Sequence, residues 1–213
     1  GDATEGAMSM YNYLKQQSNG AYAPPVDVFG PVTLSSTYAT YGANDSNGDD
    51  TNPAQMIADA CLALDSQIDF SQYDSNSDGV VDNVYVLYAG KGEADGGEAN
   101  TIWPHQWTLQ AAGITLRLDG KYIRSYACSA ELNGSGKCAM GTPLHEFGHV
   151  IGLPDYYDTE YKSTNYTESR TPGDWSIMDQ GSYNNDGNTP PNYSVFDKYY
   201  LGWLTPKFLA KDA

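Results

Sequence analysis

The sequence predicts an α/β fold, in which a mixed twisted β-sheet is covered by a backing helix and by a second helix that carries polar side chains. The segment PAQMIADACLALDSQI at 53–68 begins with proline and repeats apolar residues at helical spacing. The segment NVYVLYAG at 83–90 is a continuous apolar run, which favours a central strand buried on both faces. Within 114–128, Asp119 and Gly120 form a strong hairpin signal between two strand-like runs.

The other elements follow from local spacing and turn residues. Apolar residues at helical spacing predict a helix within residues 1–20. Two short runs rich in β-branched residues, at 26–30 and 32–36, are expected to form edge strands. Further helices are predicted at about 142–152 and at about 194–201.

Composition and charge exclude several classes of protein. The chain has 213 residues and a formal net charge of −16, from 11 Lys and Arg against 27 Asp and Glu. This charge repels phosphate backbones and anionic membrane surfaces, so we expect no nucleic-acid partner. No apolar run approaches the ~20 residues that a membrane span needs, and we expect a pro-segment and flanking domains in a longer parent protein. Whether Cys128 and Cys138 form a disulfide stays open.

The segment HEFGH at 145–149 has the spacing of a zinc site. His145 and His149 are four residues apart, so on a helix they lie on one face and can direct ring nitrogens at one ion. Glu146 lies at the edge of that face, where it can act as a general base without binding the metal. A bare HExxH also occurs by chance on helices whose histidines only pack, so the residues that follow it decide between the two interpretations.

The chain after the second histidine is expected to supply a third ligand. Thr142 suits the N-cap of the helix, and Gly152 suits its left-handed end. A proline two residues after Gly152 cannot continue the helix, so the chain turns back toward the histidines. Asp155 and then Asp158 follow this turn, and either carboxylate can complete the site.

The motif HExxHxxGxxD in HEFGHVIGLPD resembles the extended zinc signature of the metzincin-like peptidases, with aspartate where most members have a third histidine. The resemblance favours Asp155 as the third ligand, with Asp158 as the competing residue. Downstream, GDWSIMDQGSY is similar to the methionine turn of those enzymes. Met178 is then expected to pack under the histidine ligands, although a methionine here also suits an ordinary core.

Five segments between about residues 65 and 206 resemble, in the expected order, the immune inhibitor A-type metallopeptidases, which are secreted bacterial zinc proteases. They are YDSNSDGVVDNVYVLYAG, IWPHQW, HEFGHVIGLPDYYD, WSIMDQGS and YLGWLTP. The resemblance implies a zinc endopeptidase that is made as a latent precursor, is secreted or held at the bacterial surface, and has calcium sites that support its fold.

A metzincin-like zincin fold is the corresponding expectation for the architecture. Residues 1–213 would form a single catalytic peptidase domain. The upper lobe, to about residue 152, would hold the sheet, the backing helix and the zinc helix. The small irregular lower lobe, from about residue 153, would hold the methionine turn and the C-terminal helix, with the cleft between the two lobes.

An acidic loop precedes the predicted strand at 83–90. The sequence DSNSDGVVD places oxygens at positions 1, 3, 5 and 9 of an EF-hand-like loop, with glycine at position 6 and a backbone carbonyl at position 7. Because position 12 lacks the usual glutamate, the loop indicates either a structural calcium site or a simple acidic turn. Its candidate ligands are Asp74, Asn76, Asp78, Val80 and Asp82. The segment NDSNGDD at 44–50 is a second candidate.

Several aromatic side chains are candidates for the cleft. Tyr183 follows Met178 by five residues and can donate a hydrogen bond to an oxyanion, as can Tyr156 and Tyr157. His105 lies between two tryptophans in IWPHQW, where it either stabilises a transition state or packs as a hydrogen-bonded core residue. The chain holds 18 tyrosines, so position alone does not single out one of them.

The predicted function is zinc-dependent hydrolysis of internal bonds in protein or peptide substrates. Zinc lowers the pKa of water to about 7, and Glu146 takes the proton of that water. Two alternatives stay open: a calcium-stabilised surface binding module with a vestigial or structural zinc site, and a zinc amidase or exopeptidase. The intact Glu146 argues against the binding module, because a structural zinc site usually closes its fourth position with protein.

Overall fold

The computed structural model describes residues 9–137, 139–159 and 171–207. The helices are α1 (Met10–Gln17), α2 (Tyr38–Gly42), α3 (Pro53–Leu64), α4 (Gly141–Val150) and α5 (Val195–Tyr200). The strands are β1 (Val84–Lys91), β2 (His105–Thr108), β3 (Leu116–Leu118), β4 (Lys121–Ile123) and β5 (Ser125–Leu132). Four 3₁₀ turns complete this part of the chain: η1 (Phe70–Tyr73), η2 (Glu93–Asp95), η3 (Gly173–Trp175) and η4 (Gln180–Tyr183). In the described part of the chain, no helix is long and apolar enough to cross a membrane.

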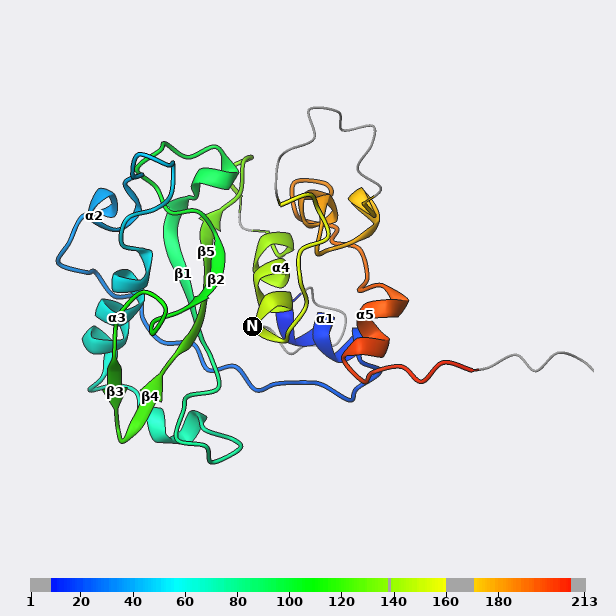
Figure 1. Ribbon diagram of the computed structural model, residues 1–213, viewed down its shortest axis with the longest axis horizontal. Coiled ribbons are helices and arrows are strands. Elements are labelled where there is room, and N and C mark those ends of the chain that lie inside the picture. Colours follow the sequence, from blue (N-terminus) through cyan, green and yellow to red (C-terminus); the bar gives the residue numbers. More distant parts are fainter. Residues whose placement is uncertain (1–8, 138, 160–170, 208–213) are drawn as a thin grey trace, which may run out of the picture.

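The main sheet has the strand order β1-β5-β2, with β1 parallel and β2 antiparallel to β5. Cys128 of β5 pairs with Val86 on one side and with His105 on the other. Figure 1 shows the sheet between α3 on one side and α4 on the other. The expected mixed sheet is therefore confirmed, and the helix that carries the two histidines packs against it.

The prediction that 83–90 forms the central strand is wrong. In the described structure β1 pairs only with β5, and Leu87 on it is 61% exposed. The central strand is β5, in which four successive residues, 126–129, are buried. A run of apolar residues shows that a segment suits a strand, but the order of strands depends on long-range pairing that the run does not encode.

The expected edge strands at 26–30 and 32–36 are also absent from the structure. This segment has no regular secondary structure and runs across the surface from α1 to α2 (Figure 1). Three prolines, at positions 24, 25 and 31, remove backbone donors that a strand would use. Val28 is 77% exposed, so the apolar residues of this segment do not supply a buried strand face either.

The predicted hairpin is confirmed. β3 and β4 form a separate two-stranded antiparallel sheet, with Leu118 opposite Lys121. The two residues between them, Asp119 and Gly120, both have positive φ values, of 48° and 82°. Such a turn matches the right-handed twist of paired strands, and glycine and aspartate tolerate the left-handed conformation.

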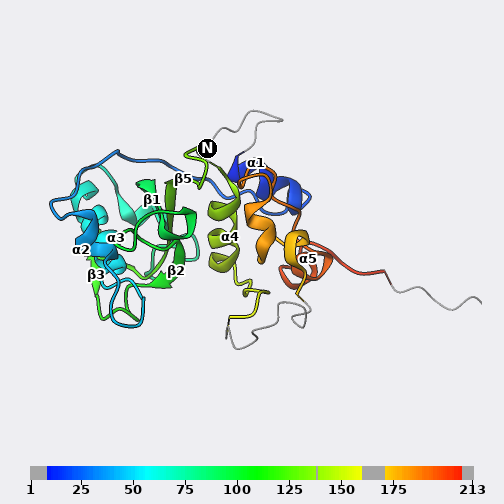
Figure 2. The ribbon, with the colours of Figure 1, turned by 90° about the horizontal axis from the view of Figure 1, so that it is seen from above.

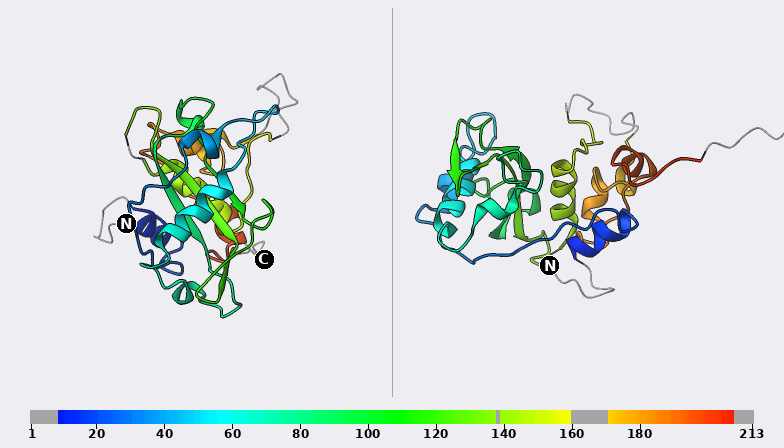
Figure 3. Two further views of the ribbon diagram at one scale, coloured as in Figure 1. Left: turned by 90° about the vertical axis from the view of Figure 1, so that its left-hand side faces the viewer. Right: turned by 90° about the horizontal axis from the view of Figure 1, so that it is seen from below.

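The N-terminal helix packs with the C-terminal part of the chain, on the side of α4 that faces away from the sheet (Figures 2 and 3). Leu14 of α1 is fully buried in a cluster with Leu144 of α4 and Met178. The side-chain amide of Gln17 donates to Asn192 at 2.7 Å. Two segments about 175 residues apart in sequence therefore support the same face of α4.

Candidate metal centre

The helix α4 begins differently from the sequence-based expectation. Its N-cap is Met140 and not Thr142, which lies inside the first turn. The backbone N–H groups of Met140 and Gly141 both donate to the carbonyl oxygen of Gly187, at 3.2 and 2.9 Å. A Cβ atom on Gly141 would lie 1.8 Å from the carbonyl oxygen of Ser182, so only glycine permits this approach. A tertiary contact thus replaces the local cap.

The end of α4 follows the expected pattern. Gly152 has a φ of 99°, a left-handed conformation that suits glycine. The N–H of Gly152 donates to the His149 carbonyl, and the N–H of Leu153 donates to the Gly148 carbonyl, both at 3.0 Å. These bonds close the last turn and direct the following residues back along the helix.

Three side-chain atoms converge beyond this turn. His145 Nε2 and His149 Nε2 lie 3.2 Å apart, and Asp155 Oδ1 lies 3.2 Å from each of them. Ligands of a tetrahedral zinc ion, with bonds of about 2.0–2.1 Å, lie about 3.3 Å apart. The triangle formed by the two nitrogens and the oxygen therefore has the size that one zinc ion requires.

The other ring nitrogens fix the protonation of both imidazoles. Nδ1 of His145 lies 2.8 Å from the carbonyl oxygen of Ile177, and Nδ1 of His149 lies 2.8 Å from that of Leu153. Carbonyl oxygens only accept hydrogen bonds, so each Nδ1 carries a proton, and in the neutral form of each ring Nε2 presents a lone pair. Asp155 Oδ1 is buried and receives no hydrogen bond from the described residues, which is the environment of an oxygen that binds a cation.

Glu146 lies beside these atoms without joining the triangle. One of its carboxylate oxygens and one nitrogen each of His145 and His149 all lie within 4.8 Å of one another. Its side chain is buried, and burial raises its pKa to about 7, although the neighbouring histidines oppose the shift. A carboxyl group with such a pKa can both accept and return a proton near neutral pH.

Met178 is fully buried in the cluster that packs on the side of α4 facing away from the sheet. A Cβ atom on Gly148 would lie only 2.4 Å from the methionine Sδ, so the glycine allows the thioether to approach the helix closely. Gly148 lies between the two histidines in the sequence. Ile177, the residue before Met178, supplies the carbonyl oxygen that orients the ring of His145. The methionine segment thus packs on α4 next to Gly148, and its neighbour Ile177 contacts His145.

Asp158 and Asp155 are the two competing candidates for the third ligand. Asp158 is half-buried, and the carboxylate at 3.2 Å from both histidines belongs to Asp155. The ring of Tyr157 stacks on His145 with a centroid distance of 6.5 Å. Tyr183 is 45% exposed and lines a pocket at the N-terminal end of α4.

His105 is held by hydrogen bonds on both ring nitrogens. Nδ1 lies 2.7 Å from the Trp103 carbonyl oxygen, and Nε2 lies 2.9 Å from the hydroxyl of Tyr126. Burial lowers its pKa, which keeps the ring neutral. These contacts support the packing role of His105. Cys138 lies outside the described residues, while Cys128 is a buried free thiol.

The acidic loop that precedes β1 folds around its own side chains. Asp74 accepts hydrogen bonds from the N–H groups of Asp78 and Gly79, and Lys121 Nζ lies 2.6 Å from its Oδ2. Asn76 Oδ1 also accepts from the N–H of Asp78. Further contacts run from the Val80 N–H to Asp78 and from the Ser75 N–H to Asp82. These bonds join Asp74, Asn76, Asp78 and Val80, whereas Asp82 is bonded to Ser75. The ammonium of Lys121 lies beside the most buried carboxylate of the loop.

The structure adds one residue that the sequence interpretation missed. Asp197, on α5, is fully buried and accepts a hydrogen bond from the Tyr156 hydroxyl at 2.5 Å. It also forms a capping box with Ser194. The pattern Ser-x-x-Asp at 194–197 signals that cap in the sequence, but nothing local signals its contact with the residue that follows Asp155.

A helix that presents two histidines and a buried glutamate, followed by a returning carboxylate, defines the class of zinc-dependent peptidases. Comparison with known proteins agrees with this class. The family described as "Immune inhibitor A peptidase M6, catalytic domain" matches residues 1–204. The chain therefore belongs to the immune inhibitor A (M6) family of metallopeptidases, as the resemblance of its sequence segments suggested.

Two relatives illustrate the similarity. The chain is 30% identical over 219 residues to "Immune inhibitor A" of Bacillus thuringiensis subsp. alesti, covering 89% of this chain and 31% of that protein. It is 29% identical over 222 residues to "Pre-pro-metalloprotease PrtV" of Vibrio cholerae serotype O1 (strain M66-2), covering 92% of this chain and 24% of that protein. The chain thus spans less than a third of the length of these relatives.

Proposed function

We propose that this chain is a zinc-dependent endopeptidase domain that hydrolyses internal peptide bonds of extracellular proteins. The proposed zinc ligands are His145 Nε2, His149 Nε2 and Asp155 Oδ1. The observation that carries the proposal is the triangle of these three atoms with edges of 3.2 Å, which includes a buried oxygen without a hydrogen-bond donor in the part of the chain that the structure describes. A zinc ion bound there would supply positive charge that lowers the pKa of water and polarises a carbonyl group.

The chain's own residues would perform the proton transfers. Glu146 takes a proton from the attacking water and passes it to the amine of the departing product, for which its pKa near 7 is suited. The carbonyl oxygens of Ile177 and Leu153 hold the two imidazoles in the orientation that directs Nε2 toward the site. Tyr157 stacks on the ring of His145 and is a candidate for contact with the substrate.

An extended substrate is favoured by the arrangement of the sheet. β2 is antiparallel to β5, lies beside α4, and has an outer edge without a strand partner among the described residues. A peptide that passes the metal site can form backbone hydrogen bonds with such an edge. This arrangement supports cleavage within a chain in preference to removal of a terminal residue.

Substitution of the general base tests the proposed function. Glu146→Gln should lower kcat by at least about 100-fold, because a positioned acid-base group contributes about 10²–10⁴-fold to rate. Zinc content should stay at one ion per chain, since Glu146 is not a ligand. Turnover of a mixed peptide library by the wild type and the variant, with zinc measured by atomic emission, checks both points. A zinc-loaded wild type that cuts none of the peptides in calcium would contradict the proposal.

We also propose a structural calcium ion at the loop 74–82, as the sequence suggests. The clustering of its side-chain oxygens supports this, and calcium binding requires the ammonium of Lys121 to leave Asp74. The segment 44–50 is a second candidate for this calcium ion, because one side-chain oxygen each of Asn44 and Asp50 is buried without a hydrogen-bond partner among the described residues. We expect calcium to raise the melting temperature, and Asp78→Asn should remove the effect. If Asp50→Asn removes it instead, the ion belongs to the second segment.

Residues 1–213 are proposed to act as one catalytic unit, with a metzincin-like zincin fold, within a longer secreted precursor. The name "Pre-pro-metalloprotease" of one relative supports the precursor, and the small share of each relative that the chain spans supports flanking domains. The strongly acidic composition is consistent with protein substrates and not with nucleic acid.

A further inference from the structure

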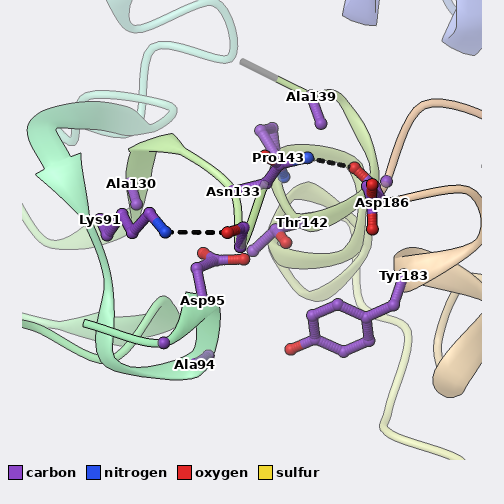
Figure 4. A pocket seen from close by; sticks show the side chains of 13 residues that line it. Lys91, Ala94, Asp95, Ala130, Asn133, Ala139, Thr142, Pro143, Tyr183 and Asp186 are labelled. Carbon is purple, nitrogen blue, oxygen red and sulfur yellow. Dashed lines mark hydrogen bonds between the residues drawn. The ribbon is translucent and has the colours of Figure 1, made fainter. Parts of the chain in front are cut away.

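A pocket of about 420 Å³ lies at the N-terminal end of α4, between the loop after β1 and the segment that contains η4 (Figure 4). Its polar lining residues are Lys91, Asp95, Asn133, Thr142, Tyr183 and Asp186. Small apolar side chains, among them Ala94, Ala130 and Pro143, complete the walls. The pocket thus has apolar walls and a few charged groups.

The more buried of the two acids in this pocket is Asp95, whose side chain has no hydrogen bond from any residue in the described structure. It is only 8% exposed, and Figure 4 shows its carboxylate directed into the pocket, on the side toward Thr142. Burial raises its pKa, and the charge of Lys91 partly opposes that shift. A cationic donor that enters the pocket would form a charge-assisted hydrogen bond with this carboxylate, in surroundings that are largely shielded from water.

The lysine of the pocket is already engaged. Lys91 Nζ donates to the carbonyl oxygen of Gly134 at 2.8 Å, so its ammonium is held at the wall (Figure 4). Asp186 is the second acid of the lining, and its residue is exposed. With two carboxylates against one ammonium, the lining has a net negative charge. It therefore favours a positively charged group over an anion.

The pocket adjoins the proposed catalytic face. Thr142, in its lining, is four residues before Glu146, so the two side chains share one face of α4. Four residues correspond to about 6 Å along a helix axis. Consecutive residues of an extended peptide are about 3.3 Å apart, so a side chain within a few residues of the bond at Glu146 would reach the pocket.

We propose that this pocket binds a lysine or arginine side chain of the substrate, with Asp95 as the residue that selects the positive charge. The apolar walls of Ala94, Ala130 and Pro143 suit the aliphatic stem of such a side chain, while the carboxylate accepts from its charged end. The inference rests on the proposed endopeptidase function and names the class of residue that this function selects near the cleaved bond.

Cleavage of matched peptides tests the selection. One quenched fluorescent peptide is prepared with lysine, leucine or glutamate in turn at each of the three positions on either side of the cut. At one position, kcat/KM for lysine should exceed that for leucine by about tenfold or more, the scale of a charged hydrogen bond. Asp95→Asn, which keeps the shape of the side chain, should bring that ratio close to one. Asp65→Asn removes the same charge from an exposed residue and should leave the ratio unchanged.

Two outcomes would overturn the inference: no lysine preference at any position, or a preference that survives Asp95→Asn. If Asp95→Asn does not fold, Ala139→Lys provides a second variant, because it places a fixed ammonium in the pocket lining. This variant should also lower the lysine-to-leucine ratio. A ratio that stays at the wild-type value would contradict the proposal.

A binding measurement separates this inference from the proposed function. The lysine peptide, labelled with fluorescein, is titrated with Glu146→Gln protein and with the Glu146→Gln/Asp95→Asn double variant. Fluorescence anisotropy should show about tenfold weaker binding to the double variant. Equal affinities would reject the pocket. A wild type that cleaves no peptide, together with an Asp95-dependent difference in binding, would reject the proposed function alone.

Discussion

At the scale of single residues, the site depends on which carboxylate returns to the histidines. The sequence leaves Asp155 and Asp158 both available, because each follows the glycine turn within six residues of its end. In the structure, the oxygen at 3.2 Å from both Nε2 atoms belongs to Asp155. A shift of three residues along an irregular segment changes direction and reach, which spacing in the sequence does not encode.

The choice of ligand can be tested directly. Asp155→Ala should weaken zinc binding by more than about 100-fold, because loss of a residue that only supports a ligand already costs about 10–100-fold. Asp158→Ala is the matched control and should keep zinc affinity near the wild-type value. Competition with a chromogenic chelator measures both affinities. Loss of zinc from the Asp158 variant alone would show that the other carboxylate binds the ion.

At the scale of elements, α4 and α5 were both predictable because their ends carry local signals. Gly152 ends α4 with a φ of 99°, and Ser194 and Asp197 form a capping box at the start of α5. The start of α4 was not predictable, since it depends on the carbonyl oxygen of Gly187. Local propensity thus determines an element where its cap is local, and fails where a distant backbone group provides the cap.

The link between these elements passes through Tyr156, whose hydroxyl donates to the buried Asp197. Tyr156→Phe should lower the free energy of unfolding by about 1–3 kcal/mol, because Asp197 loses a donor in a buried position. Zinc affinity should fall by about tenfold, since Tyr156 adjoins Asp155. Urea unfolding of the metal-free protein and chelator competition measure the two effects.

Tyr200→Phe is the control for this substitution, because Tyr200 lies on α5, the helix that carries Asp197, and is 61% exposed. It should change neither quantity by more than about 0.5 kcal/mol. Destabilisation by Tyr156→Phe without any change in zinc affinity would show that Asp197 supports the fold but does not position the ligand.

At the scale of the whole molecule, the face of α4 opposite the sheet is built from both ends of the chain. Leu14 in α1 packs in one buried cluster with Leu144 and Met178. Leu14→Ala should lower the free energy of unfolding by about 2–5 kcal/mol, the usual effect of a cavity at a buried leucine. Leu62→Ala, at a leucine that is 53% exposed, should have a small effect in the same urea titration. Similar losses in the two variants would contradict this role of α1.

The sequence by itself determined the local features of the site and one turn of the fold: the spacing of His145 and His149 on a helix, the glutamate beside them, the glycine end, and the hairpin at Asp119 and Gly120. Each depends on residues within a few positions of one another, where helical and turn geometry is nearly fixed. Only the tertiary structure decided the central position of β5, the docking of α1, the approach of Asp155 and the pocket around Asp95. These depend on contacts between distant segments, which are set by the packing of the whole core and not by any local pattern.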